Sequence, residues 1–344
     1  MLITLKDTTA SQIASEILKH RRAQGASGLV FTLVVIAEER HYAGVRAACI
    51  EAGREHPSRI LIVVKGRSTR SVLDAEILSG DVVPGSVITL RMSGELAEHG
   101  ASVVLPLLLP DSPVVVWWPN TSPDKPADDP IGALATRRIT DASGARKPLE
   151  ALRIRAKHHS PGDTDLTWTR LTLWRALLAA ALDQYPTRVL GATVEAAREN
   201  APAELMAAWL QDRLGVPVTR KNTRGPGITG VRLITPAGDI SVLRDDEATM
   251  AEYRVPGQPQ RTVALKRRDI NQLITEELRR MDADDIFESA TQMLLKRCKA
   301  EDRLAAKKAA APATKAVTTT RRTPARKRSA AAKPAPAEPD EAGR

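Results

Sequence analysis

Three features that would narrow the function at once are scarce in this sequence: cysteine, aromatic residues and long apolar runs. Cys49 and Cys298 are the only cysteines among 344 residues. Two cysteines so far apart exclude a disulfide framework and fit a reducing compartment. No apolar run approaches the ~18 residues that cross a bilayer, and the first residues lack the basic start of a signal peptide. We therefore expect a cytoplasmic protein that contacts no membrane.

Aromatic residues make up only 3% of the chain, whereas hydrophobic residues as a whole make up 42%. The core must therefore consist mainly of Val, Leu, Ile and Ala. Against this background the five tryptophans stand out, and they mark places where a large side chain has a particular use.

The formal net charge of +10 is concentrated at the C-terminal end. From residue 301 onward the chain has eleven Lys or Arg residues and five Asp or Glu residues, which leaves +4 for residues 1–300. A nearly balanced body gives no indication of a polyanionic partner. The basic tail over 300–344 is suited either to a weak, salt-dependent contact with nucleic acid or simply to keeping the protein in solution.

Residues 1–160 alternate predicted strands and helices, which is typical of an α/β domain. Continuous apolar or alternating runs predict strands at 29–36, 59–64, 72–78, 86–92, 114–118 and 137–141. Helices are expected at 38–53, 96–109 and 147–159, with a kink or an end at Pro106. We predict a Rossmann-like domain with a mostly parallel sheet.

Residues 161–299 change in character, because the predicted strands are short and separated by Gly or Pro turns. Strands are expected at 188–196, 216–221, 231–235, 240–243 and 262–266, and helices at 202–214, 269–281 and 283–299. We predict a smaller α+β domain with an antiparallel sheet. After it, residues 300–344 have too few large apolar side chains to offset their ordering entropy, so we expect a disordered tail.

Motifs for nucleotide binding and hydrolysis are absent or misplaced. The sequence contains no P-loop, no G-x-S-x-G and no H-E-x-x-H. A G-x-G-x-x-G pattern occurs at 225–230, but a strand-like run follows it and Pro226 removes one amide, so a hairpin turn is favoured over a pyrophosphate site. We therefore expect no cofactor and no metal ion.

The segment Pro161–Arg175 concentrates two Asp, two Trp and two Arg in fifteen residues. Asp163 and Asp165 are good N-cap types for the helix predicted after them. Arg175 falls on the apolar arc of that helix. A buried cation needs a carboxylate partner, and a neighbouring Asp could supply it.

Two further places have residues suited to a contact surface. His56, Ser58 and Arg59 introduce a buried strand, and their nearness in sequence is no evidence for a catalytic triad. Trp117 and Trp118 end another strand. Because adjacent strand residues point to opposite faces, one of these rings can lie in the core while the other approaches a crevice or a partner.

Three motifs in combination resemble the OpcA family of glucose-6-phosphate dehydrogenase assembly proteins. They are REHPSR (54–59), LPLLLPDSPVVVWWP (105–119) and PGDTDLTWTRLTLWR (161–175). The similarity runs in the same order through most of residues 1–300 and leaves the basic tail outside. It implies a non-catalytic partner that glucose-6-phosphate dehydrogenase requires for assembly or full activity, at the entry to the oxidative pentose phosphate pathway.

The leading hypothesis is therefore an assembly factor or allosteric activator, not an enzyme. The residues predicted to contact the dehydrogenase are His56, Ser58, Arg59, Trp117, Trp118, Asp163, Asp165, Trp168, Arg170 and Arg175. The alternative is a sugar-phosphate or nucleotide-binding enzyme whose phosphate site is formed by Arg175, Arg170, Arg59 and His56. A third possibility is nucleic-acid association through the tail.

Overall fold

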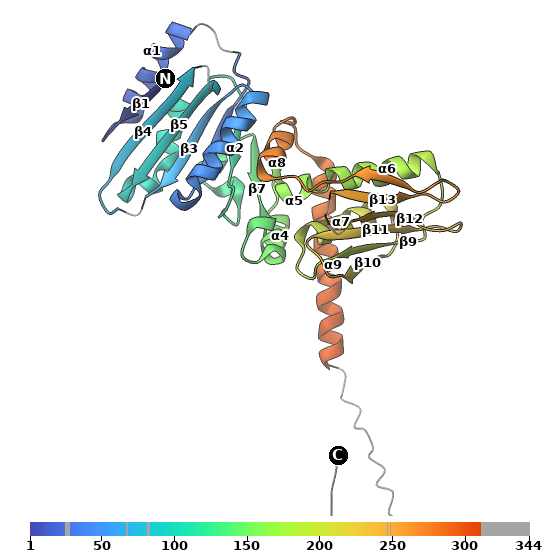
Figure 1. Ribbon diagram of the computed structural model, residues 1–344. Coiled ribbons are helices and arrows are strands. Elements are labelled where there is room, and N and C mark those ends of the chain that lie inside the picture. The colour runs from blue at the N-terminus through green and yellow to red at the C-terminus, as the bar shows by residue number, and fades with distance from the viewer. Residues whose placement is uncertain (25–27, 67, 81–82, 246, 248, 311–344) are drawn as a thin grey trace, which may run out of the picture. The chain divides into compact units, whose positions relative to one another are not determined.

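The computed structural model describes residues 1–24, 28–66, 68–80, 83–245, 247 and 249–310. In this part of the chain the strands form two sheets, one of eight strands and one of six (Figure 1). The sites discussed below lie within Met1–Glu301, which forms one unit.

The first sheet has the strand order β1-β4-β5-β3-β2-β6-β7-β8. From β5 to β8 all neighbours are parallel, whereas β4 pairs antiparallel with β5 and β1. The bounds are β1 (Leu2–Leu5), β2 (Thr32–Ala37), β3 (Ser58–Lys65), β4 (Val72–Gly80), β5 (Val83–Ser93), β6 (Val114–Trp117), β7 (Arg137–Thr140) and β8 (Asp163–Asp165). The predicted Rossmann-like, mostly parallel sheet is confirmed.

Both faces of the central strands are covered, as their continuous apolar runs predicted. Ile60 of β3 packs with helix α2 (Tyr42–Glu55), and the next residue, Leu61, packs on the other face with helix α1 (Ala10–Gln24). Helix α8 (Ile270–Glu277) comes from the last third of the chain and joins α2 on its face of the sheet. Figure 1 shows α2 and α8 near one another despite their separation in sequence.

The prediction of one helix over 96–109 is wrong. Three short elements take its place: η2 (Gly94–Glu98), α3 (Gly100–Val104) and η3 (Leu105–Leu107). Pro106 has no N–H to continue α3 and is accommodated in the first turn of η3. The proline therefore ends the helix rather than kinking it.

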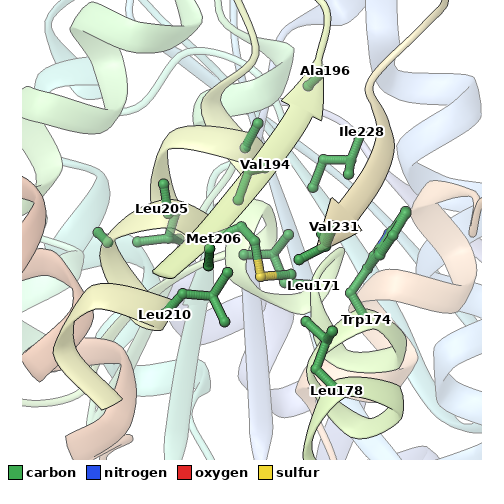
Figure 2. Packing of buried hydrophobic residues seen from close by; sticks show 14 of the residues in the cluster. Leu171, Trp174, Leu178, Val194, Ala196, Leu205, Met206, Leu210, Ile228 and Val231 are labelled. Carbon is green, nitrogen blue, oxygen red and sulfur yellow. The ribbon is translucent and has the colours of Figure 1, made fainter. Parts of the chain in front are cut away.

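The second sheet has the order β10-β9-β11-β12-β13-β14, and all of its pairs are antiparallel except β10 with β9. Its strands are β9 (Gly191–Ala196), β10 (Val218–Asn222), β11 (Ile228–Ile234), β12 (Ile240–Arg244), β13 (Met250–Arg254) and β14 (Arg261–Ala264). Figure 2 shows its core, where side chains of β9 and β11 pack against helices α6 (Thr172–Gln184) and α7 (Ala201–Leu214). The predicted α+β arrangement is confirmed.

The turn expected at the G-x-G-x-x-G pattern is not a hairpin. Strands β10 and β11, which it connects, lie on opposite sides of β9 and do not pair with one another. Strand β13 was not predicted, because only Ala251 and Tyr253 of its five residues are buried and the apolar signal is correspondingly weak.

The remaining helical elements before residue 170 are short. They are η1 (Glu39–His41), η4 (Pro126–Asp128), η5 (Gly132–Leu134), η6 (Ala142–Gly144), α4 (Pro148–Lys157) and α5 (Leu166–Thr169). The domain boundary expected between residues 160 and 161 stays a prediction. Strand β8 lies just beyond this point and pairs with β7 of the first sheet.

The disordered tail was expected to start at residue 300, and this predicted start is too early. Helix α9 (Asp285–Ala310) continues past that point, because Ala, Lys, Arg and Glu in this stretch are strong helix formers. The rest of the predicted tail, residues 311–344, lies outside the described residues.

Candidate functional site

The segment Pro161–Arg175, which we call the linking segment, joins the cores of the two sheets. Its first part is the edge strand β8, and Leu166 at the start of α5 packs in the core of the first sheet. Two residues later Trp168 packs in the core of the second sheet, together with Trp174 of α6. A short length of chain with large apolar side chains therefore fixes the position of one core against the other.

The two aspartates of this segment have different roles. Asp165, one of the predicted N-cap candidates, is the N-cap: it accepts a hydrogen bond from the Thr167 amide at 2.8 Å and another from the Thr140 hydroxyl at 2.6 Å. Asp163 is not a cap but a residue of strand β8, and its carboxylate pairs with Arg138 of the neighbouring strand β7. Both carboxylates are buried and are bound by groups of their own chain.

Arg175 does not pair with an aspartate, contrary to expectation. Its guanidinium lies over the Trp168 ring, 3.5 Å from the ring centroid, and donates a hydrogen bond to the Thr172 hydroxyl at 3.4 Å. Asp163 and Asp165 are bound instead by Arg138, Thr140 and the Thr167 amide. Burial lowers the pKa of Arg175 to about 10, and the carboxylates of Asp284 and Glu277 oppose the shift.

Arg170 is the cation of this segment that forms a close ion pair. Its two terminal nitrogens donate to the two oxygens of Asp141 at 2.8 and 2.9 Å. Asp141 is buried, whereas 29% of the Arg170 side chain is exposed. Burial raises the pKa of Asp141, and the charge of Arg170 opposes this shift.

Glu277 is the residue that the sequence analysis missed. It is buried at the end of α8 and accepts hydrogen bonds from Arg137 at 2.5 Å, from Thr164 at 3.0 Å and from Thr169 at 2.5 Å. One carboxylate thus joins α8 to β7, β8 and α5. The signal was available: at helical spacing Glu277 falls on the same face as Leu273, Ile274 and Leu278, as a charge among apolar residues.

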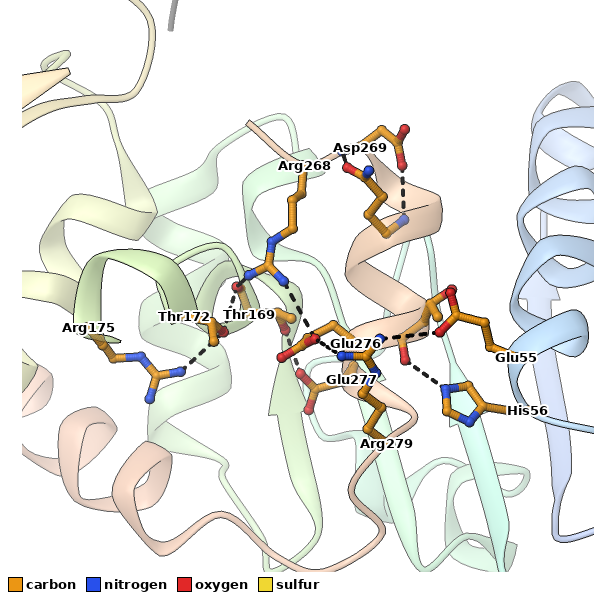
Figure 3. Close-up of polar contacts among 12 residues, drawn as sticks. Glu55, His56, Thr169, Thr172, Arg175, Arg268, Asp269, Glu276, Glu277 and Arg279 are labelled. Atoms are coloured by element: carbon orange, nitrogen blue, oxygen red, sulfur yellow. Dashed lines mark hydrogen bonds and ion pairs between the residues drawn. The ribbon is translucent and has the colours of Figure 1, made fainter. Parts of the chain in front are cut away.

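Residues before, within and after α8 make further polar contacts around Glu277 (Figure 3). The Arg268 guanidinium donates to the Thr169 carbonyl at 2.7 Å, and on the other side His56 Nε2 lies 3.0 Å from the Thr275 carbonyl. At the surface, Arg279 lies 3.3 Å from a Glu55 oxygen, which adds a second contact between α8 and the end of α2. We call residues 268–284 the closing segment. Beyond the helix, Trp168 Nε1 donates to Asp284 at 2.8 Å.

Of the ten residues predicted to contact a partner, those of the linking segment lie together, and the others lie apart from them. Seven of the ten candidate side chains are buried: Ser58, Arg59, Trp117, Trp118, Asp163, Asp165 and Trp168. These seven side chains contact other parts of the same chain, so they do not form a contact surface themselves. The remaining three, His56, Arg170 and Arg175, are partly exposed.

The alternative phosphate site does not assemble. Arg59 donates to the Leu107 carbonyl at 2.9 Å within the first sheet, and His56 is held by the backbone of α8. Arg170 lines a cavity beside α7, and neither Arg175 nor Arg59 nor His56 lines it. These four side chains therefore cannot converge on one phosphate.

Trp117 and Trp118 point to opposite faces of the first sheet, as predicted, and both are buried. The Trp118 ring also lines a cavity of about 400 Å³ at the carboxyl ends of β2 and β6. This is where parallel α/β sheets commonly bind nucleotides. Here Glu38 follows β2 and accepts a hydrogen bond from Thr121 at 2.8 Å, so a carboxylate occupies the place where a glycine-rich turn would offer amides to a pyrophosphate.

Two further observations concern metals and membranes. Within the described ranges, no three His, Cys, Asp or Glu side chains come close enough to hold a metal ion. No helix in that part of the chain is long and apolar enough to span a bilayer.

Two family models match the chain. One is described as the glucose-6-phosphate dehydrogenase subunit N-terminal domain and matches residues 50–157. The other is described as the C-terminal domain of the same subunit and matches residues 161–291. Together they take in strands of both sheets and the whole linking segment. No curated protein matches the chain.

Solved structures that resemble the chain are only distantly similar. A point mutant of KijD10, a 3-ketoreductase from Actinomadura kijaniata, is 9% identical with a TM-score of 0.42, over 77% of this chain and 95% of that one. An NAD binding oxidoreductase from Klebsiella pneumoniae is 9% identical with a TM-score of 0.41, over 81% and 98%. A putative myo-inositol dehydrogenase from Sinorhizobium meliloti gives 9% and 0.42, over 81% and 98%.

Proposed function

This chain belongs to the OpcA family of glucose-6-phosphate dehydrogenase assembly proteins, and we propose that it is a non-catalytic partner of that dehydrogenase. The family match over residues 50–157 and 161–291 carries the proposal. A partner that binds the active state of the enzyme more tightly than the inactive state shifts the population toward activity. The protein would do this in the cytoplasm, at the entry to the oxidative pentose phosphate pathway.

A non-catalytic role is supported by the state of the polar groups in and around the linking segment. Asp163, Asp165 and Glu277 are buried and their oxygens accept hydrogen bonds from their own chain. A general acid or base must reach a substrate proton, and groups enclosed in this way reach none. Their chemistry is that of a structural clamp.

We place the contact with the dehydrogenase around Arg170. It is partly exposed, and its bidentate pair with Asp141 holds it in a fixed orientation, so little side-chain entropy is lost on binding. Arginines of this kind are enriched among the residues that dominate interface energies.

The test is to purify the dehydrogenase with and without this chain and to measure co-elution and specific activity. We expect a complex on size exclusion and a saturable rise in activity. The double variant Asp141→Asn/Arg170→Gln removes both charges of the Asp141–Arg170 ion pair, so that no unpaired carboxylate stays buried. We expect the half-saturating concentration to rise about tenfold.

A matched control is Glu252→Gln with Arg254→Gln, which removes an exposed ion pair of 2.8 Å on strand β13. This control should activate like the unmodified chain. Absence of both co-elution and activation by the unmodified chain would refute the proposed function. Normal activation by the Asp141/Arg170 variant would leave the function standing and would remove Arg170 from the interface.

A further inference from the structure

A cavity of about 300 Å³ lies beside the start of helix α7 in the second half of the chain. Its walls come from three places that are distant in sequence: the start of α6, the loop between β10 and β11, and residues 265–268. Its volume is at the lower end of the range of small-molecule sites in proteins.

The lining of this cavity is strongly cationic. Five cationic side chains face one carboxylate, that of Glu199; the five are Arg170, Arg244, Lys266, Arg267 and Arg268. Two of the five are neutralised elsewhere, since Arg170 pairs with Asp141 and Arg268 lies 3.8 Å from Glu276. An excess of positive charge remains in the hollow.

Lys266, Arg244 and Arg267 carry this excess, and the two arginines have the fork that suits a phosphate. Within the described ranges neither guanidinium has a carboxylate oxygen within 4 Å, the limit for an ion pair. Arg244 lies over the Trp174 ring, 4.9 Å from the centroid, and one terminal nitrogen donates to the Ile228 carbonyl at 3.4 Å, while its buried Nε has no hydrogen-bond partner. Burial lowers the pKa of Arg244 to about 10, and repulsion from Arg267 adds to the shift.

The glycine pattern singled out in the sequence shapes this site. Gly227 has φ of 73°, which favours glycine, and the Arg267 guanidinium lies 3.1 Å from the position that a Cβ would occupy there. The absence of a side chain lets Arg267 lie against the loop. Beside it, helix α7 begins at Ala201, so the positive end of its dipole adds to the potential in the cavity.

The floor of the cavity is apolar and is formed by Leu171, Trp174 and Leu265, while the half-exposed Leu173 lies at its rim. A site with cations on one side and an aromatic ring on another suits a small molecule with an anionic group and a less polar body. Arginine forks match the oxygens of phosphate better than a point charge does.

We propose that this cavity binds a small phosphorylated metabolite, whose phosphate is held by Arg244 and Arg267 at the start of α7. The ligand supplies the negative charge that the lining lacks, and its body packs on Trp174. Arg170 lines this cavity and is also the residue proposed to contact the dehydrogenase, so the two sites adjoin. The proposal does not rest on the dehydrogenase, because the isolated chain should bind the ligand whether or not the enzyme is present.

The experiment measures thermal unfolding of the full chain with increasing inorganic phosphate, glucose 6-phosphate or glucose, each against chloride at the same ionic strength. We expect a saturable rise in Tm with both phosphates and none with glucose. A lower dissociation constant for glucose 6-phosphate than for inorganic phosphate would show that the apolar floor contributes. The reverse order would contradict packing of the ligand body on Trp174 and would overturn the proposal of a metabolite site.

Variants locate the binding. Arg267→Glu reverses a partly exposed charge at the cavity and should weaken phosphate binding at least tenfold, as should Arg244→Gln. Arg254→Glu is the matched control, because it reverses an exposed charge of the same sheet outside the cavity and should bind phosphate normally. All variants keep the basic tail, so weak binding there is equal in each.

Three further results would overturn the proposal. The first is a Tm that rises equally with chloride. The second is a rise that never saturates. The third is an Arg267→Glu variant with unchanged affinity. If Arg244→Gln fails to fold through loss of its packing on Trp174, the result with Arg267→Glu decides.

Discussion

At the residue scale, the buried charges that contact the linking segment contribute to stability as pairs. Glu277 and Arg137 are both buried, at 7% and 2% exposure, and each is the compensating charge of the other. Removing one partner of such a pair costs far more than removing an exposed pair, because the remaining charge stays desolvated.

Glu277→Gln should therefore destabilise the protein by about 3–5 kcal/mol, seen as a lower urea midpoint. The adjacent Glu276→Gln is the control. Glu276 pairs with Arg279 at the surface, at 3.0 Å, and its loss should cost about 0–1 kcal/mol. Equal effects of the two substitutions would show that Glu277 is no clamp.

His159 gives a second prediction, on pH. Its ring is packed against Phe287, and burial lowers its pKa below the usual range, although Asp163 and Glu288 act in the opposite direction. The unfolded chain therefore takes up a proton at a higher pH than the folded chain does. Stability falls as pH drops below ~6.5, the ordinary histidine value, and levels off below the folded pKa.

We expect the free energy of unfolding to decrease from pH 8 to pH 5.5 and to decrease less in His159→Gln than in the unmodified protein. Urea unfolding at the two pH values measures this. A variant with the same decrease as the unmodified protein would show that another group governs the acid side.

At the scale of elements, the sequence predicted the helices and strands that are marked by a strong local pattern of residues. β3 is a run of buried aliphatic residues, and α7 has Pro202 in its first turn and Gly215 in the left-handed conformation just past its end. Elements that depend on tertiary packing were missed. The weakly apolar strand β13 is one case.

The site was predicted only in part, for the same reason. Asp165 as an N-cap follows from residue type and spacing alone. The contact of Arg175 was not predicted, because its guanidinium stacks on the Trp168 ring, whereas the sequence analysis expected a carboxylate partner. Glu277 lies 108 residues from Thr169, which binds it, so only the fold brings them together.

Helix α8 carries Glu277, and a capping box at its start holds it. The Asp269 side chain accepts a hydrogen bond from the Gln272 amide at 2.9 Å, and Gln272 reaches back to the Asp269 amide. Asp269→Ala should destabilise α8 by about 1 kcal/mol, whereas Asp269→Asn retains a capping side chain and should cost little.

Hydrogen exchange of the α8 amides measures this directly. Faster exchange in Asp269→Ala, with unchanged exchange in β3, would show local opening of the closing segment. Uniform changes across both elements, or none in α8, would contradict the assignment of a local cap.

At the scale of the whole molecule, the linking and closing segments make one unit of two sheets. Pro161–Arg175 contributes to both cores, and residues 268–284 bind it from outside. The buried carboxylates of Asp163, Asp165 and Glu277 are bound by groups of the same chain. A rigid body of this kind can favour one state of a partner by binding, which is how we account for its proposed action.

The most direct test of this account is an activity titration of glucose-6-phosphate dehydrogenase at fixed concentration with the purified chain. We predict no dehydrogenase activity from the chain alone and a rise in specific activity that saturates as the complex forms. Activity from the chain alone, or an unchanged rate at every concentration with no complex on size exclusion, would contradict it.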